Sequence, residues 1–253
     1  MDPNVPPADA RLTEPGFRQR GQQVTRLETF VDAAFAFSLT LLVIFHNELP
    51  DTVAELRAAL RRVPTFAICF VLLALFWNAH NRWSRRFGLE DAKSTVLSLA
   101  FVLVVLVYVY PLRMVTSSGL FMLTGGWVPS ELGIDRADWL LDLQTAFMVY
   151  ALGFGLLSWI LWRLNAHALR HADALALDAR ERYTTATEIG VYRIMAGAAA
   201  VSLLLSLAII TWPPQHLIGL IVSLPMWAYA VMGGVLGFYS ASRERRAGAL
   251  AAP

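Results

Sequence analysis

The chain has 253 residues, of which 57% are hydrophobic and only 16% are charged, and its mean hydropathy is +0.51. This composition is too apolar for a soluble domain and predicts a protein that lies in a lipid bilayer. The formal net charge of +2 comes without a basic cluster interleaved with aromatic residues, so we expect no nucleic-acid partner. Cys69 is the single cysteine, which excludes an intrachain disulfide.

Six windows of the sequence are long enough to cross a hydrocarbon core of about 30 Å, which takes about 20 helical residues. The short alternating segments of a membrane barrel are lacking, so we predict an all-α membrane protein with six transmembrane helices. The windows are 27–46, 64–83, 95–115, 139–162, 191–212 and 216–239.

Basic residues are distributed unevenly between the two sides that these windows define. With the N-terminus inside, fifteen Lys and Arg residues fall on the inner side and five on the outer side, and Arg193 lies near the inner end of the fifth helix. The positive-inside rule therefore places both termini in the cytoplasm. We further expect a multi-pass protein of the plasma membrane. We expect a polar cytoplasmic segment at 1–25 without a cleavable signal peptide, one transmembrane domain at 26–240 and a cytoplasmic tail at 241–253.

Asp32 places a carboxylate near the start of the first predicted helix, where the next charge along the chain is Glu48. An ionised side chain at bilayer depth costs roughly 2.5–3.5 kcal/mol even on the lenient insertion scale, unless it faces protein or water. Partners are available at the end of the second window, because Trp77, His80 and Asn81 share one face of that helix at the same membrane surface. We expect contacts among Asp32, Trp77 and His80, with Arg26 as a further partner.

Two interpretations of this polar group remain open. A polar contact that holds two helices together is the favoured one. The other is a proton relay, because intramembrane pairs of an acid and a histidine also carry protons in pumps and transporters.

A stripe of the first helix is formed by Phe37, Leu41 and Ile44 at i, i+4 and i+7, with Thr40 on its flank. Such a stripe suits helix packing or lipid contact as well as a pore lining. Asp32 lies about 140 degrees away from Phe37 on the helical wheel and points to another part of the bundle.

Other local patterns predict structure more than chemistry. Thr52 and Glu55 have capping-box spacing and predict the start of a short interfacial helix with Val53, Leu56, Ala59 and Leu60 on one side. We expect 116–138 to be an outer loop and 163–190 to be an inner extension of the fourth helix followed by a connector. The GxxxG spacing of Gly233 and Gly237 indicates close helix packing, inside or between subunits.

A metal site is not expected. His167 and His171 have i, i+4 spacing next to Asp173, but without cysteines or a clear fourth ligand they are interpreted as solvated surface. Common nucleotide, hydrolase and zinc-protease motifs are absent from the sequence, and so is a carbonyl filter motif. We therefore expect neither an enzyme nor a bound cofactor.

The run from Arg26 through Phe30 to Asp32, followed by an Ala, Leu and Thr-rich apolar stretch, resembles the motif of the TMEM175 family of potassium channels. Trp77 and His80 at the end of the second window strengthen the resemblance, as do the six spans with both termini inside. The likeness covers about 27–240, although its specific motifs occupy only the first two helices. It differs at Val31, where the family usually has Ser.

What the resemblance implies is a homotetramer in which the first helix of each subunit lines the pore. The family's constriction falls on Phe37, with further pore-lining positions at Thr40, Leu41 and Ile44. Phe37 is a second departure, because the family usually has Ile or Leu there, and a phenyl ring would narrow the constriction.

The functional prediction is a potassium-permeable cation channel whose partners are other copies of itself, the lipid bilayer and potassium ions. Its runner-up is a proton-coupled carrier or proton leak that uses Asp32 and His80. A non-conducting membrane scaffold, in which Phe37 blocks the axis, is the third alternative.

Overall fold

The computed structural model describes the whole chain except residues 1–11, 15–16, 45–50, 134–137, 214–218 and 252–253; the side chains of 12–14, 44 and 247–251 are also left out. Eight helices and two short strands make up the described part. The elements are β1 Leu12–Glu14, β2 Phe17–Arg18, α1 Arg26–Ile44, α2 Val53–Leu60, α3 Val63–Phe87, α4 Ala92–Leu123, α5 Trp139–Arg170, α6 Ala179–Thr211, α7 Gly219–Val222 and α8 Leu224–Ala251.

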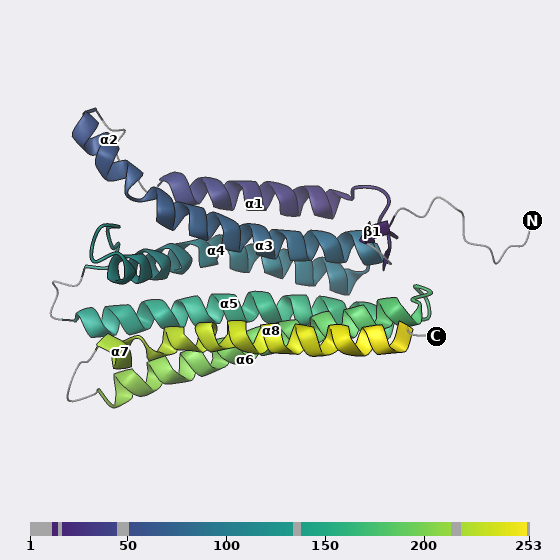
Figure 1. Cartoon of the computed structure of the whole chain (residues 1–253). Helices are drawn as coiled ribbons and strands as arrows, with labels where there is room; N and C mark the ends of the chain where they lie inside the picture. The colour runs from purple at the N-terminus through teal and green to yellow at the C-terminus, as the bar shows by residue number, and fades with distance from the viewer. Residues whose placement is uncertain (1–11, 15–16, 45–50, 134–137, 214–218, 252–253) are drawn as a thin grey trace, which may run out of the picture.

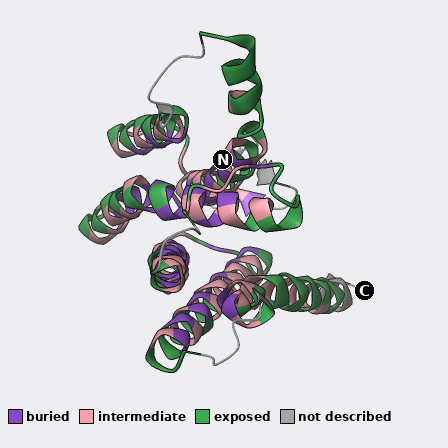
Figure 2. Cartoon of the chain, turned by 90° about the vertical axis from the view of Figure 1, so that its left-hand side faces the viewer, coloured by how far each residue is buried: buried purple, intermediate pink, exposed green. Residues whose placement is uncertain are grey.

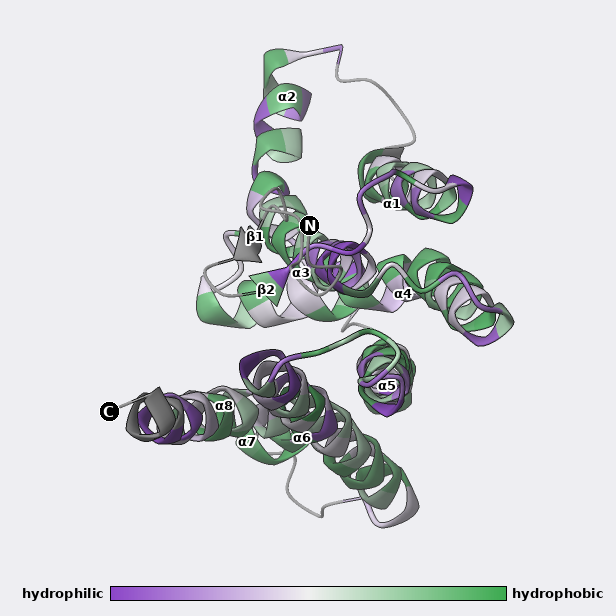
Figure 3. Ribbon diagram, turned by 90° about the vertical axis from the view of Figure 1, so that its right-hand side faces the viewer, coloured by the Kyte–Doolittle hydropathy of each residue, from purple (hydrophilic) through white to green (hydrophobic). Residues whose placement is uncertain are grey.

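The long helices run alongside one another in two groups (Figure 1). Helices α1, α3 and α4 pack together in one group and α5, α6 and α8 in the other, and contacts of α3 and α4 with α5 join the two. The start of α1 and the end of α8 lie at the same end of the bundle (Figure 1). At this end, hydrophilic residues gather on α1, α6 and α8, while the remaining parts of the helices are largely hydrophobic (Figure 3).

Aromatic rings fill the centre of the bundle. Phe76 of α3 packs edge-to-face on Tyr108 of α4 and Phe154 of α5, with ring centroids 6.4 and 5.6 Å apart. Gly153 lets α5 come close to α4 at this level, because a Cβ atom added there would overlap the Tyr108 ring. Burial of these aromatic side chains stabilises the fold by several kcal/mol. The aromatic core fixes the position of α4, against which α1 packs.

The α2 helix has no buried residue and stands away from the bundle (Figure 2). Thr52 caps it as expected, because its hydroxyl accepts a hydrogen bond from the backbone N–H of Glu55. The return bond differs from that of a regular capping box: the Glu55 carboxylate accepts from the N–H of Asp51, at 2.8 Å, instead of from Thr52.

Four segments of the described chain are long and apolar enough to cross a membrane, namely Val53–Phe87, Ala92–Leu123, Trp139–Arg170 and Ala179–Thr211. By the same criterion of length and apolar composition, α1, which carries three charged residues, and α8 are not among these segments. The predicted count of six spans therefore stays a prediction.

Two predicted boundaries are wrong. The expected outer loop begins too early, because α4 continues through Thr116 to Leu123 before a turn at Gly125 and Gly126, which both have positive φ. In the segment 163–190, the expected inner extension of the fourth predicted helix is confirmed, because α5 runs to Arg170. The connector that follows is shorter than expected, because α6 already begins at Ala179. Asp178 caps α6 through a full capping box with Glu181, a helix-start signal in the sequence that the prediction of a connector missed.

The polar N-terminal segment contains a short antiparallel pairing of β1 with β2 and then crosses the end of the bundle. Phe17 is buried against Phe87, and the guanidinium group of Arg86 lies 4.6 Å from the centre of its ring. Arg20 donates to both carboxylate oxygens of Glu181, at 3.1 and 2.7 Å, and so ties this segment to the start of α6. Glu181 is fully buried.

No close helix contact within the described chain uses the GxxxG spacing of α8. Gly233 and Gly237 are exposed, and a Cβ atom added at either would meet nothing within 4 Å. The GxxxG spacing was expected to serve packing inside the subunit or between subunits. The described residues do not use it inside the subunit, so packing between subunits stays a prediction.

Candidate functional site

Helix α1 has one face that packs into its own subunit. The side chains of Val31, Phe35, Ser38 and Leu42 are at most 3% exposed, and their spacing of i, i+4, i+7 and i+11 defines a single stripe. Phe35 reaches Phe101 of α4, with ring centroids 5.8 Å apart. The packing of this stripe on α3 and α4 leaves the opposite side of α1 uncovered.

The uncovered side carries the predicted pore-lining residues. Phe37 is 56% exposed, Thr40 is exposed and Leu41 is half-buried, while the side chain of Ile44 lies outside the described residues. Phe30, one of the motif residues, is 53% exposed on the same side. Large apolar side chains are thus presented outward by a helix whose other face is closely packed, which requires lipid or other copies of the chain to cover them.

The Thr40 hydroxyl is oriented by its own helix. It donates to the carbonyl oxygen of Ala36 at 3.0 Å, as hydroxyls in helices commonly do. Because the proton is used in this bond, the lone pairs of the oxygen point away from the helix. An exposed neutral oxygen of this kind can act as a weak ligand for a cation.

Asp32 makes the expected contact with the second predicted helix. The indole Nε1–H of Trp77 on α3 donates to its carboxylate at 2.7 Å, a charge-assisted hydrogen bond between α1 and α3. Arg26 is exposed, and no ion pair joins it to Asp32. The acid is therefore satisfied by a neutral donor at the edge of the exposed side.

His80 differs from the expectation, because its ring does not bond Asp32. It is 2% exposed, bonds Ser98 of α4 through Nε2 at 2.9 Å and stacks on the ring of Phe101. Asn81 is half-buried beside it on α3. Two neighbouring polar contacts thus exist, one between α1 and α3 and one between α3 and α4, in place of one shared network.

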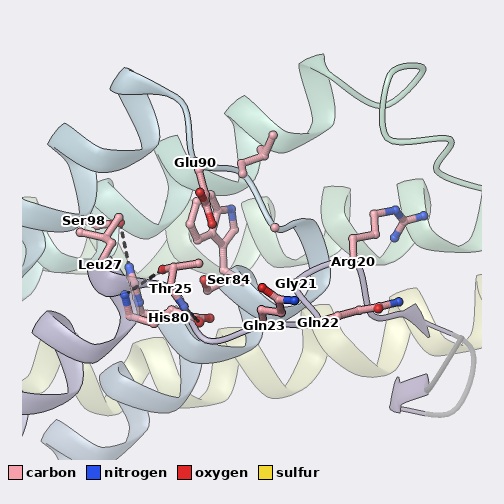
Figure 4. Close-up of a pocket in the computed structure, with 14 residues that line it drawn as sticks. Arg20, Gly21, Gln22, Gln23, Thr25, Leu27, His80, Ser84, Glu90 and Ser98 are labelled. Atoms are coloured by element: carbon pink, nitrogen blue, oxygen red, sulfur yellow. Dashed lines mark hydrogen bonds between the residues drawn. The ribbon is translucent and has the colours of Figure 1, made fainter.

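A cavity of about 310 Å³ lies next to His80 at the start of α1. Figure 4 shows His80 and Ser98 on one side of it and Arg20 on the other. Glu28, also in the lining, accepts from the N–H of Thr25 while the Thr25 hydroxyl accepts from the N–H of Glu28. This reciprocal pair caps α1, and the guanidinium of Arg85 lies 3.9 Å from the Glu28 carboxylate.

The other end of α1 is held by Arg113 of α4. Its guanidinium donates to the carbonyl oxygen of Leu42 at 3.0 Å and pairs with Glu131, although Arg113 is only 6% exposed. A cation at the C-terminal end of a helix also interacts favourably with the helix dipole. Contacts at both ends and along one face therefore fix α1 in its subunit, so that its exposed side is presented in a defined orientation.

The histidines of the inner connector do not form a metal site in the described residues. His167 bonds the carboxylate of Asp91 at 2.7 Å, His171 bonds the carbonyl oxygen of His167, and Asp173 pairs with Arg182. Asp91 precedes α4, so its contact with His167 links the two groups of helices at this end.

Several residues that shape the site were not found by sequence reasoning. Ser98 lies in an apolar helix, where a fully buried hydroxyl is a sign of a polar partner, but the sequence does not say which. Glu28 follows Thr25 at capping-box spacing, a signal that was present and overlooked. Arg113 gave no local signal of its contact with Leu42, 71 residues away.

Two groups of long apolar helices with polar contacts buried between them define a helical integral membrane protein. The TMEM175 family model, described as an endosomal/lysosomal potassium channel, matches residues 26–111, which include all of α1 and α3. A protein of Marivirga tractuosa named "Potassium channel" is 32% identical over 203 residues, covering 76% of this chain and 78% of the relative. The chain belongs to the TMEM175 family.

The fold is also found in a solved structure. A crystal structure of a variant of the potassium channel MtTMEM175, in complex with a nanobody–MBP fusion protein, superimposes with a TM-score of 0.76. It is 26% identical in sequence and covers 93% of this chain and all of its own. The likeness therefore extends beyond α1 and α3 to the entire helical bundle.

Proposed function

We propose that this chain forms a potassium-permeable cation channel, a homotetramer of six-span subunits in a bacterial plasma membrane with both termini in the cytoplasm. The observation that carries the proposal is the exposed side of α1, where Phe37 and Thr40 stand outward while the helix is held at both ends and along its other face. Family membership and the names of the related proteins support potassium as the ion.

In this proposal four copies of α1 surround the axis and Phe37 forms the narrowest ring. An apolar neck excludes water, so a hydrated ion crosses only when the neck widens or protein oxygens replace part of the ion's hydration shell. The Thr40 hydroxyls, one turn further along α1, would supply such oxygens. Neutral ligands favour potassium over sodium because potassium holds its hydration shell less tightly.

Cysteine accessibility tests this arrangement. In a Cys69→Ser background, a charged water-soluble thiol reagent should modify Thr40→Cys and reduce the potassium current of reconstituted channels, because the site faces an ion path. Ser38→Cys is the matched control, because Ser38 is fully buried only two residues away and should not react. If Thr40→Cys stays unmodified, α1 faces lipid and the proposed pore lining is wrong.

A proton-coupled carrier or proton leak is the second candidate, and the cavity beside His80 is the observation that favours it. This cavity would bring water to His80 and to Glu28 near the start of α1. Proteoliposomes with opposed potassium, sodium and proton gradients distinguish the candidates. If the parent protein carries protons but no potassium current, and both Asp32→Asn and His80→Gln abolish the proton flux, the carrier replaces the channel as the proposed function.

The third alternative, a non-conducting scaffold, would give no flux of any ion even after Phe37→Ala.

A further inference from the structure

A second cavity, with a volume of about 490 Å³, lies at the end of the bundle opposite the start of α1. It is lined by the end of α4, the start of α5, and α7 with the start of α8, elements that meet at the left of Figure 1. Its wall is largely apolar and includes Phe121, Leu143, Phe147 and Met226. A chamber of this size and lining has the character of a small-molecule site.

One carboxylate interrupts the apolar wall. Asp142, in the first turn of α5, is partly buried and lines this chamber as well as an adjoining cavity of about 570 Å³. Its backbone N–H donates to Asp138, but its side chain has no hydrogen bond or ion pair with any residue that the structure describes. A half-buried carboxylate without a partner favours a cation beside it.

Among the residues that the structure describes, no positive side chain pairs with Asp142. Glu131, the other acid of the adjoining cavity, is paired with Arg113, whose guanidinium also bonds Leu42. Ser118 and Ser130, on the wall of the apolar chamber, bond each other at 3.1 Å. In the described part of the wall, the junction of the two cavities therefore combines an apolar chamber with one carboxylate that has no positive partner.

We propose that this chamber binds a lipophilic ammonium ion, with the apolar body of the ligand among the α4, α5 and α8 side chains and its ammonium group on the Asp142 carboxylate. Charge complementarity selects this class of ligand. An anion would be repelled by Asp142, and a neutral apolar molecule would leave the carboxylate unpaired. The proposal concerns a site away from α1 and does not depend on ion conduction.

Three probes of one shape and different charge test the proposal: 1-adamantylamine, 1-adamantanol and adamantane-1-carboxylate. Binding to the purified full-length protein is measured by isothermal titration calorimetry. We expect the amine to bind about tenfold more tightly than the alcohol, because a hydrogen bond to a charged group is worth more than a neutral one, and the carboxylate to bind weakest. Equal affinities for amine and alcohol would overturn the proposal.

Variants locate the site. Asp142→Asn should abolish the advantage of the amine over the alcohol, whereas Asp138→Asn should leave it unchanged, because Asp138 is exposed and makes no side-chain capping bond. Amine binding that is unaffected by Asp142→Asn would contradict the assignment of Asp142.

Filling the chamber provides an independent test. Gly119 lines it, and a Cβ atom added there meets nothing within 4 Å, so Gly119→Leu should occupy the space and weaken binding of all three probes. Gly197→Leu is the matched control, because Gly197 is equally open but lies outside the chamber. Undiminished binding in a folded Gly119→Leu protein would place the ligand elsewhere; if that variant does not fold, the Asp142→Asn measurement decides.

Discussion

Single polar side chains connect α1 to the rest of its subunit, and the bond between Asp32 and Trp77 is the most direct of them. The indole donor lies 2.7 Å from a carboxylate, a length typical of bonds to charged acceptors. A neutral donor lets the acid stay near the membrane without a positive partner. This explains how Asp32 is tolerated although Arg26 does not pair with it.

The Asp32 contact predicts a graded effect on stability. Asp32→Asn keeps an acceptor for the Trp77 N–H and should cost less than Asp32→Leu, which leaves the indole unpaired and should cost about 1–3 kcal/mol. The midpoint of thermal unfolding in detergent measures both. Trp77→Phe is the control, since it removes the donor: in that background the two Asp32 substitutions should become equivalent, and a persistent difference would refute the assigned bond.

The Thr40 hydroxyl predicts an effect on selectivity. Thr40→Val keeps the branched shape but removes the oxygen, so the ratio of potassium to sodium permeability should fall severalfold. Thr40→Ser retains the oxygen and should keep most of the ratio. Reversal potentials under bi-ionic conditions provide the measurement, and equal ratios in all three proteins would exclude Thr40 as an ion ligand.

At the scale of elements, the N-terminal segment joins the two groups of helices through Arg20 and Glu181. Glu181 accepts from Arg20 and from the backbone N–H of Arg18, and it is fully buried. The segment continues into α1, so this ion pair also affects how the start of α1 is held.

Breaking this pair should be costly. Glu181→Gln leaves the Arg20 guanidinium without its counterion, which typically costs about 3–5 kcal/mol when the pair is buried. Arg182→Ala on the same helix is the matched control, because its partner Asp173 is 96% exposed and such pairs contribute about 0–1 kcal/mol. Unfolding midpoints compare the two, and similar losses would mean that the buried pair does not stabilise the fold.

The turn between α3 and α4 predicts a pH dependence. Partial burial works to raise the pKa of Asp91, but the bonds from Ser94 and His167 outweigh it and hold the pKa at about 2, below the usual 3.8. Because the folded-state pKa is the lower one, this carboxylate stabilises the fold above about pH 4 and that contribution disappears as the pH falls towards 2. Asp91→Asn should flatten the stability curve in this window, and an unchanged slope in acid titrations would contradict the assigned bonds.

At the scale of the whole molecule, the exposed surfaces indicate which parts need other chains. The outer side of α1 and the glycine stripe of α8 are both uncovered in the single subunit. In the proposed tetramer α1 surrounds the axis, and Phe37 controls the width of the path.

Phe37→Ala should raise single-channel conductance severalfold, because the loss of four rings widens and wets the narrowest part of the pore. Phe238→Ala is the control: Phe238 is 79% exposed on α8, away from α1, and its loss should leave conductance unchanged. Planar-bilayer recordings measure both variants. An unchanged conductance in Phe37→Ala would move the constriction to another position.

The sequence by itself determined the membrane class and the family, because both depend on local features. Long apolar windows reflect the transfer of side chains into lipid, and the motif residues Arg26, Phe30 and Asp32 lie within one helix. It also placed Trp77 opposite Asp32, because two consecutive helices meet at the same membrane surface. These inferences need only the period of a helix and the order of the elements.

Only the tertiary structure decided which polar groups are paired. Arg20 meets Glu181 across 161 residues and His80 bonds Ser98 instead of Asp32, and many other pairings were compatible with the same helices. It also decided that Phe37 and Thr40 stand outward, because the packing of Val31 and Phe35 on α3 and α4 selects which side of an apolar helix is buried. Such choices depend on the rotation and depth of each helix. Close packing between distant segments fixes both, whereas the local sequence does not.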